Sequence, residues 1–191
     1  MHVYIFRKMK EKLLFAKLKS KDKQAFTEAY DLYIDKIYRF VYFKISDPVE
    51  AEDLTSSVFL KTWNYVQQNS ITDEKTLPAL LYKIARNSVI DYYRKLSNEN
   101  QISIEGENEG VDIEDSKQDL KKKFELDSDM ENLREKLNQL KDEYREIIVL
   151  KYVDELSNTE IAEILGKSKG NVRILSFRAL NALKELMGEE K

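Results

Sequence analysis

The chain has 191 residues, including 32 Lys and Arg, 35 Asp and Glu, five Gly, two Pro, one His and no Cys. Because helix breakers are so scarce, the composition favours an all-α protein. The absence of Cys excludes disulfides and thiolate metal sites, and the lone His2 cannot form a zinc cluster or a His-based catalytic centre. No apolar run reaches the roughly 18 residues of a membrane span, and the first residues lack a signal-peptide cleavage pattern. We therefore expect a cytoplasmic, non-enzymatic protein without metal, cofactor or membrane insertion.

The net charge of −3 is distributed unevenly along the chain. Residues 1–95 contain 17 basic and 12 acidic residues, whereas residues 96–127 contain 4 and 10. The stretch 97–119 has no helical period and no aromatic residue, which predicts a flexible acidic linker; a plain surface loop is the alternative. We therefore expect two small helical domains, residues 1–95 and 128–191, joined by a linker over residues 96–127.

Periodic apolar residues predict three helices in the first domain. Within residues 26–41, apolar side chains recur at steps of three and four, as on one face of a helix. Pro48 then marks the first turn of a second helix, which continues over residues 49–66. The polar stretch 67–76 breaks the period and predicts a loop, and residues 77–95 form the third helix.

The second domain is predicted to contain helices over residues 130–140 and 143–153, followed by two short capped helices. Ser157 and Glu160 have the spacing of a capping box, which starts a helix. Gly166 ends that helix as a left-handed cap, and Ser168 caps the next one.

The spacing of small and apolar residues after Ser157 predicts a helix-turn-helix. Ala162 stands where two helices would cross, Gly166 where the turn reverses, and Val172 and Leu175 where the second helix packs back. A plain helical hairpin shares part of this pattern and remains the alternative. The second helix would enter a major groove, and its candidate DNA-contacting residues are Ser168, Lys169, Asn171, Arg173 and Arg178.

Two motifs in the first domain extend this interpretation. The stretches EAEDLTSSVFLKTWNYV (50–66) and LYKIARNSVIDYYRK (81–95), followed by the helix-turn-helix, resemble a bacterial RNA polymerase sigma factor of the sigma-70 family, in its extracytoplasmic-function group. The resemblance spans roughly residues 20–187. It implies a protein that binds core RNA polymerase, recognises the −10 and −35 promoter elements and assists strand opening. An anti-sigma protein is a further partner that the resemblance allows.

The resemblance also implies roles for particular residues. The helix over residues 49–66 would dock on the coiled coil of the largest polymerase subunit, and its candidate contacts are Glu50, Glu52, Asp53, Ser56 and Ser57. Acidic residues in a first turn also favour the helix dipole, which is the alternative explanation for them. The −10 element would be read by the outward face of the third helix and by the preceding loop, which receives a flipped base. These candidates are Lys83, Arg86, Asn87, Ile90 and Arg94 on the helix, and Ile71, Thr72, Asp73 and Lys75 in the loop.

Two other classes of function compete with this one. A two-domain regulator with a helix-turn-helix output and no polymerase binding would explain residues 157–187 but not the motifs within 50–95. An enzyme has little support, because the chain has neither a Gly-rich phosphate loop nor the Asp/Asn–Gly spacing of a calcium loop.

Overall fold

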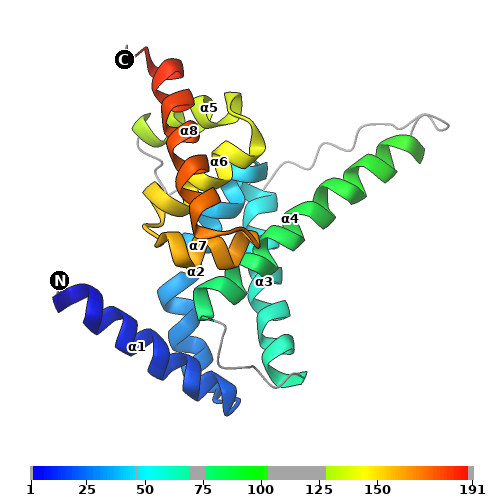
Figure 1. The fold of residues 1–191 in the computed structure, drawn as a ribbon. Helices are drawn as coiled ribbons and strands as arrows, with labels where there is room; N and C mark the ends of the chain where they lie inside the picture. The colour runs from blue at the N-terminus through cyan, green and yellow to red at the C-terminus, as the bar shows by residue number, and fades with distance from the viewer. Residues whose placement is uncertain (1, 46, 69–75, 103–127, 189–191) are drawn as a thin grey trace.

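The computed structural model describes residues 2–45, 47–68, 76–102 and 128–188, which form helices joined by short turns and contain no strand. This confirms the all-α prediction for the described residues (Figure 1). The helices of the first domain are α1 (His2–Lys19), α2 (Lys23–Ile45), α3 (Pro48–Gln68) and α4 (Leu77–Ile102). Those of the second domain are α5 (Ser128–Gln139), α6 (Asp142–Ile148), α7 (Asn158–Leu165) and α8 (Lys169–Met187), with a π-helical segment, Val149–Val153, directly after α6.

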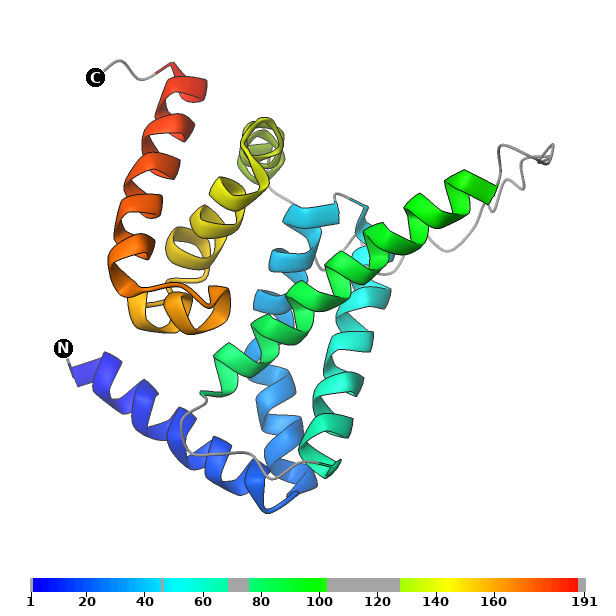
Figure 2. The same cartoon turned by 45° about the vertical axis from the view of Figure 1, so that its right-hand side comes forward.

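The first domain is built on the packing of α2, α3 and α4 (Figure 2). The face predicted for residues 26–41 is inward at Tyr33, Ile37 and Val41, which are at most 2% exposed, although Tyr30 remains 39% exposed. The ring of Phe40 meets that of Tyr82 edge-to-face, with centroids 5.3 Å apart. Aromatic pairs of this kind stabilise a core beyond the area that they bury.

The helix bounds refine the prediction in two places. Helix α1 was not expected from the sequence; it lies against α2 and α4 and buries Leu14, Phe15 and Leu18. At the other end of the domain, α4 continues to Ile102, past the start of the predicted linker. The rest of that linker, residues 103–127, lies outside the described residues.

The helix predicted over residues 143–153 is present, but its second half is wound more widely. The Asp154 amide donates to the Val149 carbonyl at 2.9 Å, five residues back, and the Leu156 amide donates to the Leu150 carbonyl at 2.9 Å. Such a π-helical turn places an additional residue in the helix and rotates the residues after it about the helix axis. It brings Asp154 to a buried position, where it is 1% exposed.

The two domains pack against each other in this structure. In both ribbon views the second domain lies beside α2 and the first half of α4, with α7 against α4 and α6 against α2. The sequence predicted two domains joined by a flexible linker, and a direct contact between them was not expected.

Candidate nucleic-acid and polymerase interfaces

Both predicted caps of the helix-turn-helix are formed. The Ser157 amide donates to the Glu160 carboxylate at 2.8 Å, and the Glu160 amide donates to the Ser157 hydroxyl at 3.3 Å, which completes the capping box. Gly166 ends α7 with φ of +64°, in the left-handed region that favours glycine. The Ser168 hydroxyl then accepts from the Asn171 amide at 3.2 Å and starts α8.

The spaced small and apolar residues also lie where the pattern predicted. Ala162 and Val172 are buried at 9% and 0% exposure, and Leu175 packs against the core from a partly buried position. The caps, the turn and the packing of α7 against α8 agree with the predicted helix-turn-helix.

The outer face of α8 carries the predicted polar side chains. Ser168 at the cap is exposed, as are Lys169, Asn171, Arg173 and Arg178 on the helix. Asn171 and Arg178 border one hollow, which Glu143 and Lys167 also line as an ion pair of 2.9 Å. Two apolar residues on this face, Ile174 and Phe177, were not expected from the sequence, and they are 53% and 66% exposed. Their exposure could have been inferred from the sequence, because a spacing of three places them together on a side of the helix away from Val172.

The outward face predicted for α4 is only partly open. Asn87, Ile90 and Arg94 are exposed, and Arg94 pairs with Asp91 at 3.2 Å. Lys83 is half-buried. The Arg86 guanidinium is held by a carboxylate of the second domain, with its Nε 3.0 Å from Glu146 Oε1. The loop candidates Ile71, Thr72, Asp73 and Lys75 lie outside the described residues.

The five polar candidates on α3 differ in their exposure. Glu50, Asp53 and Ser56 are exposed, whereas Glu52 and Ser57 are half-buried. Burial raises the pKa of the Glu52 carboxyl, and the neighbouring Asp53 raises it further. Of the three acids, Glu50 and Asp53 are therefore the better placed for a contact with another protein.

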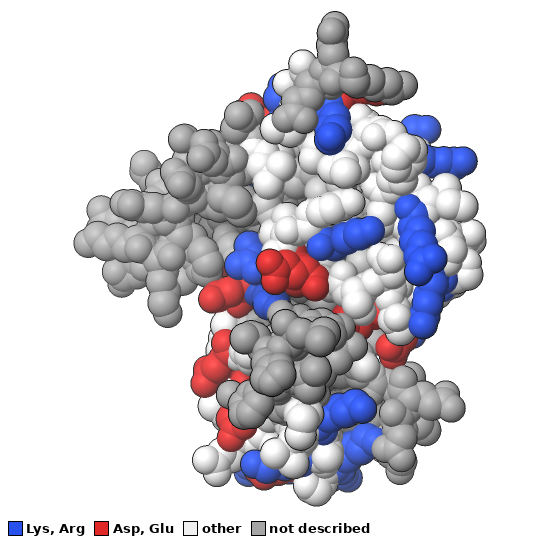
Figure 3. All heavy atoms as spheres, turned by 60° about the vertical axis from the view of Figure 1, so that its left-hand side comes forward, with Lys and Arg blue, Asp and Glu red and all other residues white. Residues whose placement is uncertain are grey.

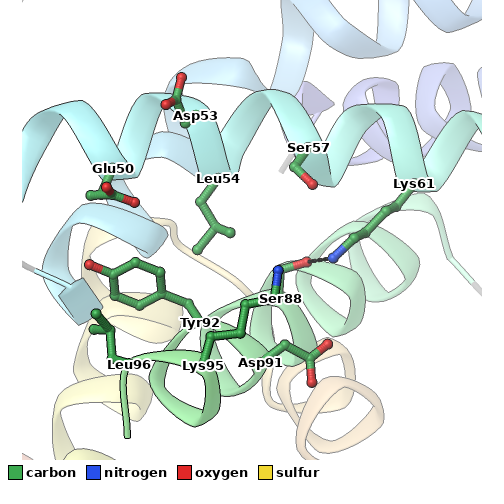
Figure 4. Close-up of a pocket in the computed structure, with 10 residues that line it drawn as sticks. All are labelled: Glu50, Asp53, Leu54, Ser57, Lys61, Ser88, Asp91, Tyr92, Lys95 and Leu96. Atoms are coloured by element: carbon green, nitrogen blue, oxygen red, sulfur yellow. Dashed lines mark hydrogen bonds between the residues drawn. The ribbon is translucent and has the colours of Figure 1, made fainter. Parts of the chain in front are cut away.

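A groove of about 480 Å³ runs between α3 and α4 beside these acids (Figure 4). Tyr92 lies at the groove wall, with its ring pointing towards α3 beside Leu54 and Glu50. Lys61 reaches across the groove and donates to the Ser88 hydroxyl at 2.9 Å. The groove therefore presents both charged and apolar groups next to the predicted polymerase face.

Charge is mixed over the face drawn in Figure 3. Among the described residues, Lys and Arg side chains gather along one margin, whereas acidic and basic side chains lie together near the middle. In the described part of the chain there is no cluster of three or more potential metal ligands. None of the described helices is both long and apolar enough to cross a bilayer.

The junction of the domains brings together residues that sequence reasoning did not single out. Glu146 and Asp154 are buried and pair with residues of α2 and α4. Burial raises the pKa of the Tyr82 hydroxyl well above its ordinary value, and the adjacent Asp154 carboxylate raises it further. The burial of Glu146 could have been inferred from the sequence, because an acid four residues before Leu150 falls on the same side of the helix.

Comparison with known proteins agrees with this arrangement of two domains. The chain matches the family model for sigma-70 region 2 over residues 29–99 and that for sigma-70 region 4 over residues 130–183. It is 33% identical over 176 residues to the ECF RNA polymerase sigma factor SigW of Bacillus subtilis (strain 168), covering 88% of this chain and 91% of that one. It is 31% identical over 159 residues to SigM of the same strain, covering 83% and 93%.

Solved structures give the same result for the fold. The sigma factor RpoE of Bartonella quintana, crystallised with the anti-sigma factor NepR, superposes with a TM-score of 0.66 at 27% identity, covering 87% of this chain and 98% of that one. CnrH, solved with the cytosolic domain of CnrY, has a TM-score of 0.69 at 18% identity over 95% and 99%, a likeness of fold alone.

These matches define a two-domain promoter-recognition protein. The chain belongs to the sigma-70 family of RNA polymerase sigma factors, in the ECF group of its relatives. Like them it is a sigma factor that directs promoter-specific transcription initiation. The relatives are sigma factors rather than enzymes, and the matches give no support to a regulator that acts without polymerase.

Proposed function

We propose that this sigma factor binds core RNA polymerase through α3 and recognises the −10 and −35 elements through α4 and α8. One observation carries the proposal: each of these helices has one side in a core and presents on the other side most of the residues that the sequence assigns to contact. The domain limits of residues 1–95 and 128–191, with the linker between them, are part of the same proposal.

The polymerase contact is proposed to centre on Glu50, Asp53 and Ser56, the exposed members of the α3 set. Glu52 and Ser57 would contribute from its half-buried edge. An acidic helix face suits a basic partner surface, and charge complementarity speeds association and fixes register more than it adds affinity.

The −10 element is proposed to bind along Lys83, Arg86, Asn87, Ile90 and Arg94. The basic groups would hold phosphates, and Asn87 and Ile90, both exposed, would be available to bases. The loop residues Ile71, Thr72, Asp73 and Lys75 are assigned to base capture on the resemblance alone.

The −35 element is proposed to bind the outer face of α8, through Ser168, Lys169, Asn171, Arg173 and Arg178. The N-terminal part of a recognition helix is the part that usually reaches base edges. Ser168 caps α8 and Lys169 to Arg173 fall in that part of the helix, whereas Arg178 comes about one and a half turns later.

Two further proposals concern partners and location. Two structural neighbours were solved with an anti-sigma factor, NepR, or with a cytosolic partner domain, that of CnrY. We propose that an anti-sigma protein also controls this chain. We further propose that the chain acts in the cytoplasm, where core polymerase is present.

In vitro run-off transcription with core polymerase over a random-promoter library tests the main proposal. We expect transcripts from a subset of templates that share two spaced elements, and none without the chain. Charge reversal at Glu50 and Asp53 should reduce transcription and co-purification with polymerase together. Binding to DNA with no dependence on polymerase would instead favour the regulator.

A further inference from the structure

Helix α8 has a buried side whose direction follows from the residues on it. Val172, Ser176 and Ala179 are at most 1% exposed. At about 100° per residue these three fall within an arc of about 60°, and Ile174 lies about 170° from the middle of that arc. Ile174 therefore projects from the side of α8 that is directly opposite the core.

The outermost side chain of α8 is thus apolar. Ile174 is 53% exposed, and Phe177, which is 66% exposed, lies about 60° around the helix from it. Gly170, about one turn earlier on the same side, has no side chain that could cover Ile174. Single exposed apolar residues are common on protein surfaces, but Ile174 occupies the part of a recognition helix that would lie deepest in a groove.

The surroundings of Ile174 suit duplex DNA better than another protein. The stretch KGNVRILSFRALNALK of α8 contains four basic residues and no acid. Asn171 and Arg178 are exposed and lie within about 60° of Ile174 around the helix. Glu143, the acid that lines the same hollow, is paired with Lys167 at 2.9 Å. The apolar surface is therefore continuous with the proposed −35 surface and surrounded by groups that suit a polyanion.

The major groove offers one hydrocarbon group that an apolar side chain can recognise, the 5-methyl group of thymine. Contact between the methyl group and an isoleucine side chain removes both from water, which is favourable. A G·C pair has no methyl group, and an isoleucine packed against its polar edge would leave that edge without hydrogen-bond partners. Ile174 can therefore distinguish base pairs without forming a hydrogen bond.

We propose that Ile174 is a specificity-determining residue, which selects a thymine in the −35 element through contact with its 5-methyl group. The inference rests on the proposed function, because it assumes that α8 enters the major groove of that element. It adds to that function the chemical identity of one base, which the polar candidates on α8 do not specify.

Replacement of thymine by uracil tests this contact, because uracil pairs with adenine in the same way and lacks only the methyl group. A promoter selected from the random library by the unaltered chain is resynthesised with deoxyuridine at each thymine of its −35 element in turn. Run-off transcription with core polymerase is then measured on each template. At one thymine we expect a loss of about fourfold, which is the effect of one methyl group that is no longer removed from water.

Variants of α8 assign the effect to one side chain. Ile174→Ala should transcribe the thymine and uracil templates equally at that position, whereas Ile174→Val retains a branched apolar side chain and should retain most of the difference. Met187→Ala is the control, because Met187 is a 56% exposed apolar residue of the same helix, about 20 Å farther along its axis. It should leave the difference unaltered. Circular dichroism of each variant reports whether its helices are retained.

Three results would overturn the inference: no loss at any thymine of the −35 element, an equal loss in the unaltered chain and in Ile174→Ala, or selected −35 elements without thymine. The uracil templates test the unaltered chain itself, so the inference remains open to refutation even if a variant folds poorly. In each of these results the unaltered chain still transcribes the selected promoter. Failure of the proposed function is a different result, in which the unaltered chain supports no transcription from any template.

Discussion

Arg173 and Arg178 are both exposed on α8, yet they cannot contact the same point on DNA. They are five residues apart, so at about 100° per residue their directions diverge by about 140°. Arg173→Ala should lose about 1–3 kcal/mol at particular upstream base pairs and relax the preference there. Arg178→Ala should weaken all promoters alike and flatten the salt dependence. Permanganate footprinting of open complexes across promoter variants measures both effects.

A substitution on α4 provides the comparison for the arginine variants on α8. Lys83→Ala should impair the downstream element and strand opening while it leaves upstream preference unchanged, because Lys83 belongs to the other domain. If Arg173→Ala altered selectivity only at the downstream element, the assignment of the two domains to the promoter would be wrong.

At the scale of elements, the turn between α7 and α8 depends on Gly166. Its φ of +64° is unfavourable for a residue with a Cβ, although a Cβ there would meet no atom within 4 Å. Gly166→Ala should therefore lower the free energy of unfolding by about 1–2 kcal/mol through the backbone alone. Urea unfolding followed by circular dichroism gives the value.

Gly170, four residues later, is the internal control for this prediction. It lies within α8, and an added Cβ would meet only the Ser168 hydroxyl oxygen at an ordinary 3.8 Å. Gly170→Ala should thus raise the free energy of unfolding by about 0.4–1 kcal/mol. Equal losses in both variants would mean that packing rather than φ determines the cost at Gly166.

The net charge of the chain and the separation of its two candidate DNA-binding surfaces should limit binding of the free protein to DNA. With a net charge of −3 and two separate candidate surfaces, the free chain should bind duplex DNA weakly and with a steep dependence on salt. Addition of core polymerase should convert this to sequence-specific binding. Fluorescence anisotropy over a salt series measures both, and tight specific binding by the free chain at moderate salt would argue against a sigma factor mechanism.

The acidic linker predicted over residues 96–127 leads to a prediction at the same scale. Moderate shortening within residues 103–127 should leave the helical content unchanged but reduce run-off transcription, because two modules on separate sites require a sufficient tether. An equal reduction from substitution at constant length would show that composition, and not reach, limits activity.

Much of the fold and of the α8 surface could be predicted because it depends on interactions between near neighbours. The capping box of Ser157 and Glu160, the left-handed turn at Gly166 and the cap at Ser168 each involve residues at most five apart. Apolar periodicity likewise indicates which side of a helix is buried, whichever partner covers it. It does not indicate how far a polar helix end extends, so the continuation of α4 to Ile102 was not predicted.

The helix-turn-helix, the apolar faces of the helices and the resemblance to a sigma factor could all be predicted from the sequence. What lies against those faces depends on the tertiary structure. Glu146 meets Arg86, and Asp154 meets Tyr82, across 60 and 72 positions of the chain. No local pattern reports such a separation, because the pairing arises when two independently formed surfaces pack. The contact that Arg86 makes with Glu146 therefore depends on how the domains are arranged and not on the motif that contains Arg86.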